Sequence, residues 1–257
     1  MKRVKFIFSY LFMLFFVGLA IWFIKNEGAE LRAVKPLIAT ASWRWLSLGL
    51  VLNIIYVLAH GMMYRAAFAT VSSKISIKAA MLLFLKRNFI SVFLPAGGVS
   101  SLAFFGADIE KKGVESSQIN YASSIYGFVG ILSVIVIAIP VFIYGIVKGT
   151  IGYGEWLGLL LVMLLLLAFY AVFKSIISKG AVYSYLIKHI PATATFTNAL
   201  ADNKIKRGYF LTTLYYSISV EVIGIVYIYI AMLALHLEPS WMIAMVSYIV
   251  GVVFLII

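Results

Sequence analysis

Long apolar segments are the feature that most restricts how this chain can fold. A helix needs ~20 residues to cross the ~30 Å hydrocarbon core of a bilayer, and each of these segments approaches or exceeds that length. Backbone polar groups find no water inside a bilayer, so such segments form helices rather than open strands. The sequence therefore predicts an all-α, polytopic membrane protein with about six spanning helices. The predicted spans are residues 6–24, 45–69, 119–147, 156–173, 209–235 and 241–257.

The composition supports the membrane class and excludes several functions. Apolar residues make up 64% of the chain and charged residues 12%, against roughly 45–50% and 25% in soluble domains. The formal charge of +12 is expected from basic cytoplasmic loops that lie near anionic headgroups. No basic stretch is interleaved with aromatic residues, so we expect no nucleic acid to bind this chain. The chain has no cysteine, which excludes disulfides, thiolate nucleophiles and cysteine metal ligands.

The first apolar segment follows Lys2 and Arg3, as the apolar part of a signal peptide would. The segment is too long for that role and no small-x-small cleavage site follows it. We therefore expect an uncleaved first span with a cytoplasmic N-terminus, and a single transmembrane domain over residues 1–257. The last predicted span runs to Ile257 without a polar flank, which favours a fragment of a longer protein.

One further apolar stretch, residues 79–105, is interrupted by charges and by a Pro/Gly break. The basic loop 174–207 is expected in the cytoplasm. Counting spans from that loop and from the N-terminus places both flanks of 79–105 on the same side. The stretch is therefore predicted to be a re-entrant or broken-helix hairpin. This topology places loop 25–44 outside the cell, whereas its four basic residues favour a cytoplasmic position.

The loop 174–207 also carries apolar residues at spacings near 3.6, together with lysines. This pattern predicts a helix lying on an anionic leaflet, with an ordinary solvated loop as the alternative. The apolar positions are Ile176, Tyr183, Leu186, Ile187 and Ile190.

The predicted hairpin contains the most informative group of polar residues. Lys86, Arg87 and Asn88 precede a break that contains Pro95, Gly97, Gly98 and Ser100. A Lys or Arg at mid-membrane costs about 2.5–3.5 kcal/mol, and an unpaired backbone at that depth needs protein or water beside it. Broken helices also direct N–H groups at anions. The pattern predicts a cavity for an anionic group such as a lipid phosphate. The alternative is that the two cations snorkel to the interface and the glycines form a simple turn.

Glu221 lies near the middle of a predicted span. Thr213, Ser217 and Glu221 are spaced by four residues, which predicts one polar stripe facing the bundle interior. The carboxylate could form a structural ion pair with Arg87, bind a cationic headgroup or carry a proton.

A second polar face, on the span 45–69, contains Asn53, Tyr56, His60 and Tyr64. It either lines the same cavity or, in the case of His60, forms a hydrogen-bonded packing contact. Ser123, with Gly127 and Gly130, is predicted to allow close helix packing.

The sequence contains no pattern that predicts catalysis, a metal or a cofactor. Its three histidines lie on segments that are far apart in the predicted topology, and no Walker, Rossmann or Gly-x-Ser-x-Gly pattern occurs. No catalytic residue, metal ligand or cofactor is therefore expected.

The segment from Lys86 through Pro95, Gly97 and Gly98, followed by a charged turn with Asp108, resembles the transmembrane region of lysylphosphatidylglycerol synthases, the multiple peptide resistance factors. The order of spans agrees with that family over most of the chain. The resemblance implies a module of the bacterial inner membrane that binds and flips aminoacylated phosphatidylglycerol, with phospholipid as its partner, and so contributes to resistance against cationic antimicrobial peptides. Homo-oligomerisation and a soluble C-terminal transferase domain stay open. The alternatives are the membrane portion of a phosphatidylglycerol lysyltransferase whose catalytic domain lies outside this chain, and a scaffold that anchors a soluble partner.

Overall fold

The computed structural model describes residues 36–91, 101, 106–148, 153–190, 194–202 and 206–256, and these ranges contain helices and no strand. This confirms the all-α class. The first predicted span, 6–24, lies outside the described residues. The helices in chain order are α3 (Trp43–Ala69), α4 (Ile77–Ser91), α6 (Ala107–Glu110), α7 (Ser116–Lys148), α8 (Tyr153–Ile177), α9 (Ala181–His189), α10 (Ala194–Ala201), α11 (Arg207–Ala234) and α12 (Trp241–Ile256).

Within the described residues, three helical segments are long and apolar enough to cross a membrane: Trp43–Ala69, Ser116–Val147 and Arg207–Ala234. Shorter apolar helical segments lie at Leu167–Ile177 and Trp241–Val252. These five segments coincide with predicted spans. The chain is therefore a multi-pass helical membrane protein.

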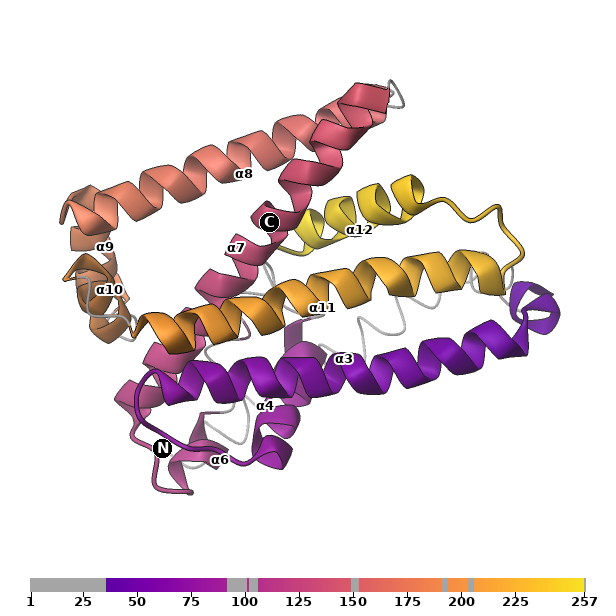
Figure 1. Cartoon of the computed structure of the whole chain (residues 1–257). Coiled ribbons are helices and arrows are strands. Elements are labelled where there is room, and N and C mark those ends of the chain that lie inside the picture. Colours follow the sequence, from indigo (N-terminus) through magenta and orange to yellow (C-terminus); the bar gives the residue numbers. More distant parts are fainter. Residues whose placement is uncertain are drawn as a thin grey trace, which may run out of the picture.

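Helices α3 and α11 lie side by side and antiparallel (Figure 1). The Ser42 backbone N–H, just before α3, donates to the Ala234 carbonyl at the end of α11 over 2.9 Å. At the opposite end, the Lys206 ammonium, just before α11, donates to the Ser72 hydroxyl over 3.0 Å. Each helix therefore begins beside the end of the other.

The turns that end α3 and α11 use residues with left-handed backbone conformation. Ser72 has φ 62° and His236 has φ 57°. After α3, the Ser73 N–H bonds to the Phe68 carbonyl, and after α11 the Leu237 N–H bonds to the Met232 carbonyl. This six-to-one bonding satisfies carbonyls that would otherwise lack a partner at a helix end.

Small residues allow α4 to pack closely against α3. Ala67 and Ala80 are fully buried in the core, and Gly61 faces α4. A Cβ added at Gly61 would lie 2.7 Å from the Cγ atom of Met81. Lipid removes most of the hydrophobic driving force between helices, so close contact of this kind is a main source of their association.

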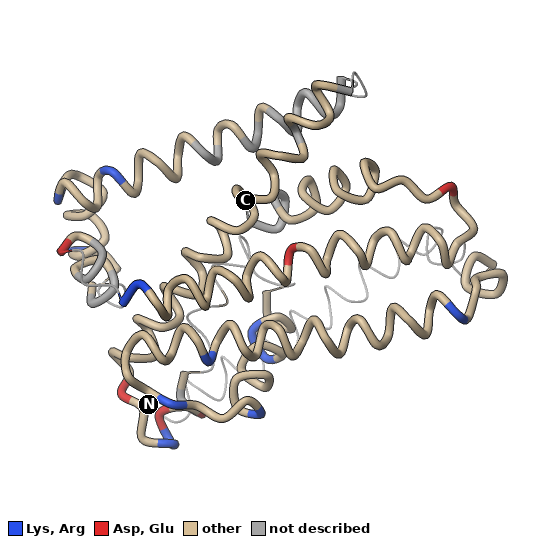
Figure 2. The backbone as a smooth tube through the Cα atoms, in the orientation of Figure 1, with Lys and Arg blue, Asp and Glu red and all other residues tan. Residues whose placement is uncertain are grey.

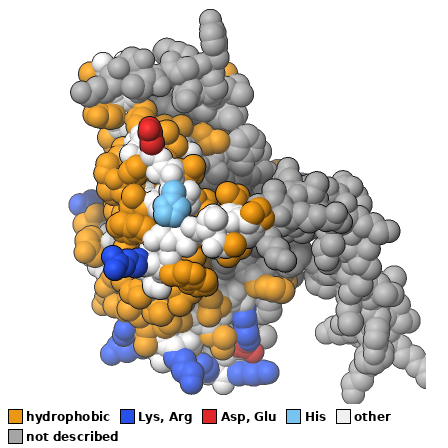
Figure 3. Space-filling model, turned by 90° about the vertical axis from the view of Figure 1, so that its right-hand side faces the viewer, with side chains coloured by type: hydrophobic (Ala, Val, Ile, Leu, Met, Phe, Trp, Pro, Cys, Tyr) orange, Lys and Arg blue, Asp and Glu red, His pale blue; other side chains and the backbone are white. Residues whose placement is uncertain are grey.

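The outward faces of the long helices are apolar, as lipid contact requires. On α3, Leu50, Ile54 and Leu58 recur every four residues and are 70%, 62% and 44% exposed. Figure 3 shows hydrophobic side chains over much of one face of the molecule. Figure 2 shows long stretches of the helices without charge. Large aliphatic side chains can remain exposed at this density because the surrounding solvent is hydrocarbon.

Helix α4 is short for a spanning helix. Its 15 residues extend about 22 Å, less than the ~30 Å hydrocarbon core. Its Pro/Gly break and residues 92–100 lie outside the described residues. The two flanks of the predicted hairpin are close together, since the Ser73 hydroxyl, before α4, donates to the Gln118 side-chain oxygen at the start of α7 over 2.9 Å. The re-entrant form of the stretch 79–105 stays a prediction.

The loop 174–207 contains two short helices, α9 and α10. Helix α9 includes Tyr183, Leu186 and Ile187 of the predicted interfacial stripe. Ile176 instead belongs to α8 and is buried, and a turn with Lys179 at φ 52° separates it from α9. The regular spacing in the sequence therefore runs across a helix break. The location of α9 on a membrane surface stays a prediction.

We expect single cysteines at Lys74 and Lys112 to be labelled from the same side of the membrane. Both positions are exposed and flank the predicted hairpin. A cysteine at Glu238, at the opposite end of α11, is the control and should be labelled from the other side. The measurement is labelling of this cysteine-free chain with a membrane-impermeant maleimide in sealed, oriented vesicles. Labelling of Lys74→Cys and Lys112→Cys from opposite sides would contradict the re-entrant topology.

Candidate functional site

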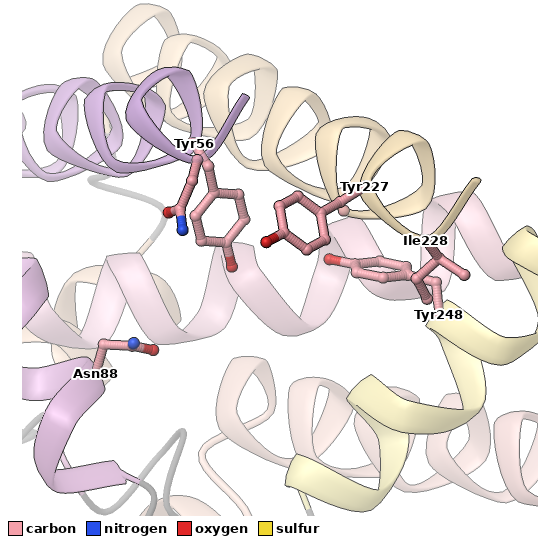
Figure 4. A pocket seen from close by; sticks show the side chains of 7 residues that line it. Tyr56, Asn88, Tyr227, Ile228 and Tyr248 are labelled. Atoms are coloured by element: carbon pink, nitrogen blue, oxygen red, sulfur yellow. The ribbon is translucent and has the colours of Figure 1, made fainter. Parts of the chain in front are cut away.

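A cavity of about 420 Å³ lies where α3, α4, α11 and α12 come together. Figure 4 shows tyrosine side chains from three of these helices pointing toward one another, with Asn88 of α4 facing them. Among the described residues that line it, most side chains end in a hydroxyl or an amide and none is charged. The lining residues are Asn53, Tyr56, Asn88, Gly224, Tyr227, Ile228 and Tyr248.

A second cavity, of about 280 Å³, adjoins the first and shares Asn53 with it. Its other lining residues are apolar: Leu50, Ile54, Val57 and Met81. Leu50 and Ile54 are also among the most exposed aliphatic residues of α3. A polar cavity therefore lies next to an apolar one that is lined by exposed residues of α3.

The close approach of α12 to α11 depends on Gly224. A Cβ added at this position would lie 2.1 Å from the Tyr248 ring. The ring thus occupies the space that any larger residue at Gly224 would need. This packing places the Tyr248 hydroxyl at the cavity wall and beside the carboxylate of Glu221.

Glu221 is 7% exposed and its two carboxylate oxygens have separate partners. The Ser133 hydroxyl of α7 donates to Oε1 over 2.9 Å, and the Tyr248 hydroxyl donates to Oε2 over 2.9 Å. Ser133 also shares a 2.7 Å hydrogen bond with Ser217. Thr213, Ser217 and Glu221 are all buried, as the predicted interior stripe requires. The carboxylate therefore lies in a network of hydroxyl groups from three helices.

Arg87 lies in a different polar cluster, formed with Tyr64 of α3 and Ser123 of α7. It is 3% exposed, and its guanidinium donates to the Tyr64 hydroxyl over 3.1 Å and to the Ser123 hydroxyl over 2.9 Å. The guanidinium carbon also lies 5.4 Å from the centre of the Tyr64 ring, within cation–π range. Two helices, α3 and α7, thereby hold a cation inside the bundle.

Lys86 is directed toward the surface, where it forms an ion pair with Asp108 of α6. The hydrogen bond and charge of Lys86 lower the pKa of Asp108, and Lys111 and Lys112 add to this effect. The adjacent cations Lys86 and Arg87 are therefore separated, one at the surface and one in the core.

His60 forms part of the packing behind the cavity and does not line it. Its Nδ1 shares a 2.6 Å hydrogen bond with the Tyr126 hydroxyl, and its ring stacks on Phe84 at 3.9 Å. No residue that the structure describes gives a hydrogen bond to the buried Nε2 atom. This arrangement matches the packing alternative for His60.

The predicted site residues thus fall into distinct places. Asn88 lines the cavity, Glu221 is hydrogen-bonded to the wall residue Tyr248, and Ser217 is connected to Glu221 through Ser133. In the part of the chain that the structure describes, no ion pair joins Arg87 to Glu221. The remaining candidates lie outside the described residues: Pro95, Gly97, Gly98 and Ser100.

Sequence reasoning missed Tyr227, Tyr248, Gly224 and Ser133. Tyr248 could have been found from its position, because it is an interior tyrosine in the otherwise very apolar segment 241–257. Ser123, assigned to helix packing, is instead a partner of Arg87. Gly130 was assigned to close packing as well, but a Cβ there would meet nothing within 4 Å. Both residues lie on α7, whose neighbours cannot be identified from its own sequence.

Searches of the curated proteins and of the solved structures return no match to this chain. A family described as "Lysylphosphatidylglycerol synthase TM region" matches residues 6–257, which is nearly the whole chain. The order of apolar segments and the Pro/Gly motif after Arg87 in the sequence indicate the same family. The chain therefore belongs to the lysylphosphatidylglycerol synthase transmembrane-region family.

Proposed function

We propose that this chain binds an anionic or aminoacylated phospholipid, such as lysylphosphatidylglycerol, and moves its headgroup across the bilayer. The observation that carries the proposal is the cavity that brings polar side chains from four apolar helices together. In the bacterial inner membrane, exposure of a cationic lipid on the outer leaflet would lower the negative surface charge and contribute to resistance against cationic antimicrobial peptides.

The two adjoining cavities suit the two parts of a phospholipid. Tyrosine hydroxyls and asparagine amides in the larger cavity can donate to phosphate and ester oxygens, and tyrosine rings can accept an ammonium group on their faces. The smaller, apolar cavity leads to the exposed residues Leu50 and Ile54, where an acyl chain would remain in hydrocarbon. This division supports a lipid over a small soluble ligand.

Charges behind the cavity supply partners for both ends of a lysyl headgroup. Arg87 immediately precedes the cavity residue Asn88, so its buried charge raises the positive potential at that wall. Glu221 is bonded to the wall residue Tyr248 and lies on another helix. A headgroup with its phosphate toward α4 and its ammonium group toward α11 would match the charges of Arg87 and Glu221.

The same cavity would also serve the alternative function, the membrane portion of a phosphatidylglycerol lysyltransferase. In that case, the chain delivers lipid to a catalytic domain outside this sequence. Movement of lipid between leaflets by this chain alone, in vesicles, distinguishes translocation from delivery.

Arg87→Ala is expected to reduce translocation of lysylphosphatidylglycerol in reconstituted vesicles by roughly tenfold or more. A hydrogen bond to a charged group is worth about 1.5–3 kcal/mol, which sets this scale. Arg87→Lys should restore the rate only in part, because lysine keeps the charge but lacks the fork that reaches both the Tyr64 and the Ser123 hydroxyl. Lys86→Ala, which removes the surface ion pair with Asp108, is the matched control. The amount and thermal stability of each variant are measured alongside, and an unchanged rate in a folded Arg87→Ala variant would exclude Arg87 from the site.

Glu221→Gln preserves the size of the side chain and removes its charge. It is expected to slow translocation of lysylphosphatidylglycerol more than that of phosphatidylglycerol, because only the lysyl lipid carries an ammonium group. Parallel assays of both lipids provide the measurement, with Asp108→Asn as a control for loss of an exposed carboxylate. Equal losses for both lipids would indicate a structural role for Glu221.

Gly224→Ala tests the cavity directly, because the added methyl group forces the Tyr248 ring to move. We expect lipid binding to weaken at least tenfold while the chain still folds, since the ring tip has room in the cavity. Gly251→Ala on α12 meets nothing within 4 Å and should bind lipid normally. The measurement is retention of a fluorescent phosphatidylglycerol in nanodiscs. Normal binding by Gly224→Ala would place the lipid elsewhere.

A further inference from the structure

We propose that Glu221 is a reversible proton-binding site that exchanges protons with the polar cavity through the Tyr248 hydroxyl. The inference goes beyond lipid handling and does not require that the cavity bind a particular lipid. It rests on the positions of the hydroxyl and carbonyl groups around Glu221.

The partners of Glu221 can satisfy a charged carboxylate. In that state Ser133 donates to Oε1 and Tyr248 donates to Oε2, both over 2.9 Å. Ser217 then donates to the Ser133 oxygen over 2.7 Å. Every hydroxyl hydrogen in the network has an acceptor, and both carboxylate oxygens have a donor.

The same heavy-atom positions also satisfy the neutral acid. The added proton lies on Oε2 and is donated to the Tyr248 oxygen, whose own hydrogen turns toward the cavity. Ser133 either continues to donate to Oε1 or turns its hydrogen to the Gly130 carbonyl, 2.8 Å away. Hydroxyl groups rotate freely between donor and acceptor roles, so the change of protonation state needs no movement of the helices.

The surroundings of Glu221 suit a group that changes its charge. The described titratable groups that act on it from the packed helices are tyrosines: Tyr56 on α3, Tyr126 on α7 and Tyr248 on α12. Tyrosine is uncharged near neutral pH. The cation Arg87 of α4 is held by Tyr64 and Ser123 and makes no ion pair with Glu221. Among the residues that the structure describes, no cation forms an ion pair with Glu221. A buried carboxylate in such surroundings must rely on hydrogen bonds or take up a proton.

Tyr248 provides a route between this site and water in the cavity. Its side chain lines the cavity and its hydroxyl contacts Oε2. For uptake, a hydronium ion in the cavity gives a proton to the Tyr248 oxygen as that hydroxyl passes its own hydrogen to Oε2, which leaves water and the neutral acid. Release is the reverse. A ligand that displaces the Tyr248 hydroxyl would interrupt this route. Occupancy of the cavity would therefore control proton exchange at Glu221.

Infrared difference spectroscopy of the full chain in phosphatidylglycerol nanodiscs, without any lysyl lipid, tests the proposal. Lowering the pH should produce the carbonyl stretching band of a protonated carboxylic acid, shifted in D₂O and absent in Glu221→Gln. Asp108→Asn, which removes an exposed carboxylate, should retain this band. A band that persists in Glu221→Gln, or a Glu221 band that does not change with pH, would overturn the proposal.

The role of Tyr248 is tested by the rate at which the band appears after a pH jump. Tyr248→Phe retains the ring and should slow that rate by about 10²-fold, the lower end of what a positioned acid–base group contributes. Tyr215→Phe, at a position 67% exposed on α11, is the matched control. An unchanged rate in Tyr248→Phe would refute the route.

Sodium is the competing occupant, because the site consists of oxygen atoms. Replacing choline chloride by sodium chloride at constant pH should leave the band unchanged. Loss of the band on adding sodium would identify a cation site and contradict the proton site. Lipid translocation is measured separately, so normal translocation by Glu221→Gln together with loss of its band would remove Glu221 from lipid handling and leave the proton site standing.

Discussion

Hydrogen bonding between buried polar side chains joins α7 to α11 and α12, two of the helices that line the cavity. Ser133 on α7, Glu221 on α11 and Tyr248 on α12 form one continuous set of bonds. In hydrocarbon these groups have no water as an alternative partner, so separating the helices would leave a carboxylate and two hydroxyls unsatisfied. The relative positions of α7, α11 and α12 depend on this network.

A second cluster of buried hydrogen bonds joins α3, α4 and α7. Arg87 reaches Tyr64 and Ser123, and the Tyr64 ring stacks on Tyr126 at 3.8 Å. Because α7 contributes to both clusters, it connects the cationic and the acidic sides of the bundle. The cavity lies between α4 and α12, so a ligand inside it would lie between opposite charges that do not neutralise each other. This separation is the physical basis for proposing a headgroup that carries both an anion and an ammonium group.

Close packing of glycine against a large side chain defines the shape of the cavity. Gly224 admits the Tyr248 ring, and Gly61 admits Met81 of α4. Both contacts bring a neighbouring helix nearer to the α3–α11 pair than a larger residue would allow. The polar tip of Tyr248 then faces the cavity, while its bond to Glu221 provides the route that we propose for a proton. Lipid and proton would therefore meet at one hydroxyl group.

The sequence by itself determined the helical membrane class, because segments of about 20 apolar residues leave no other way to satisfy the backbone in lipid. It also determined that Glu221 and Ser217 face the interior, since residues four apart share a helix face and a carboxylate is costly in hydrocarbon. Neighbours across helices were decided only by the tertiary structure. Periodicity within one helix identifies its buried face and does not specify which helix covers it. For this reason Arg87 was open to pairing with Glu221, whereas the fold gives it Tyr64 and Ser123 and gives Glu221 the hydroxyls of Ser133 and Tyr248.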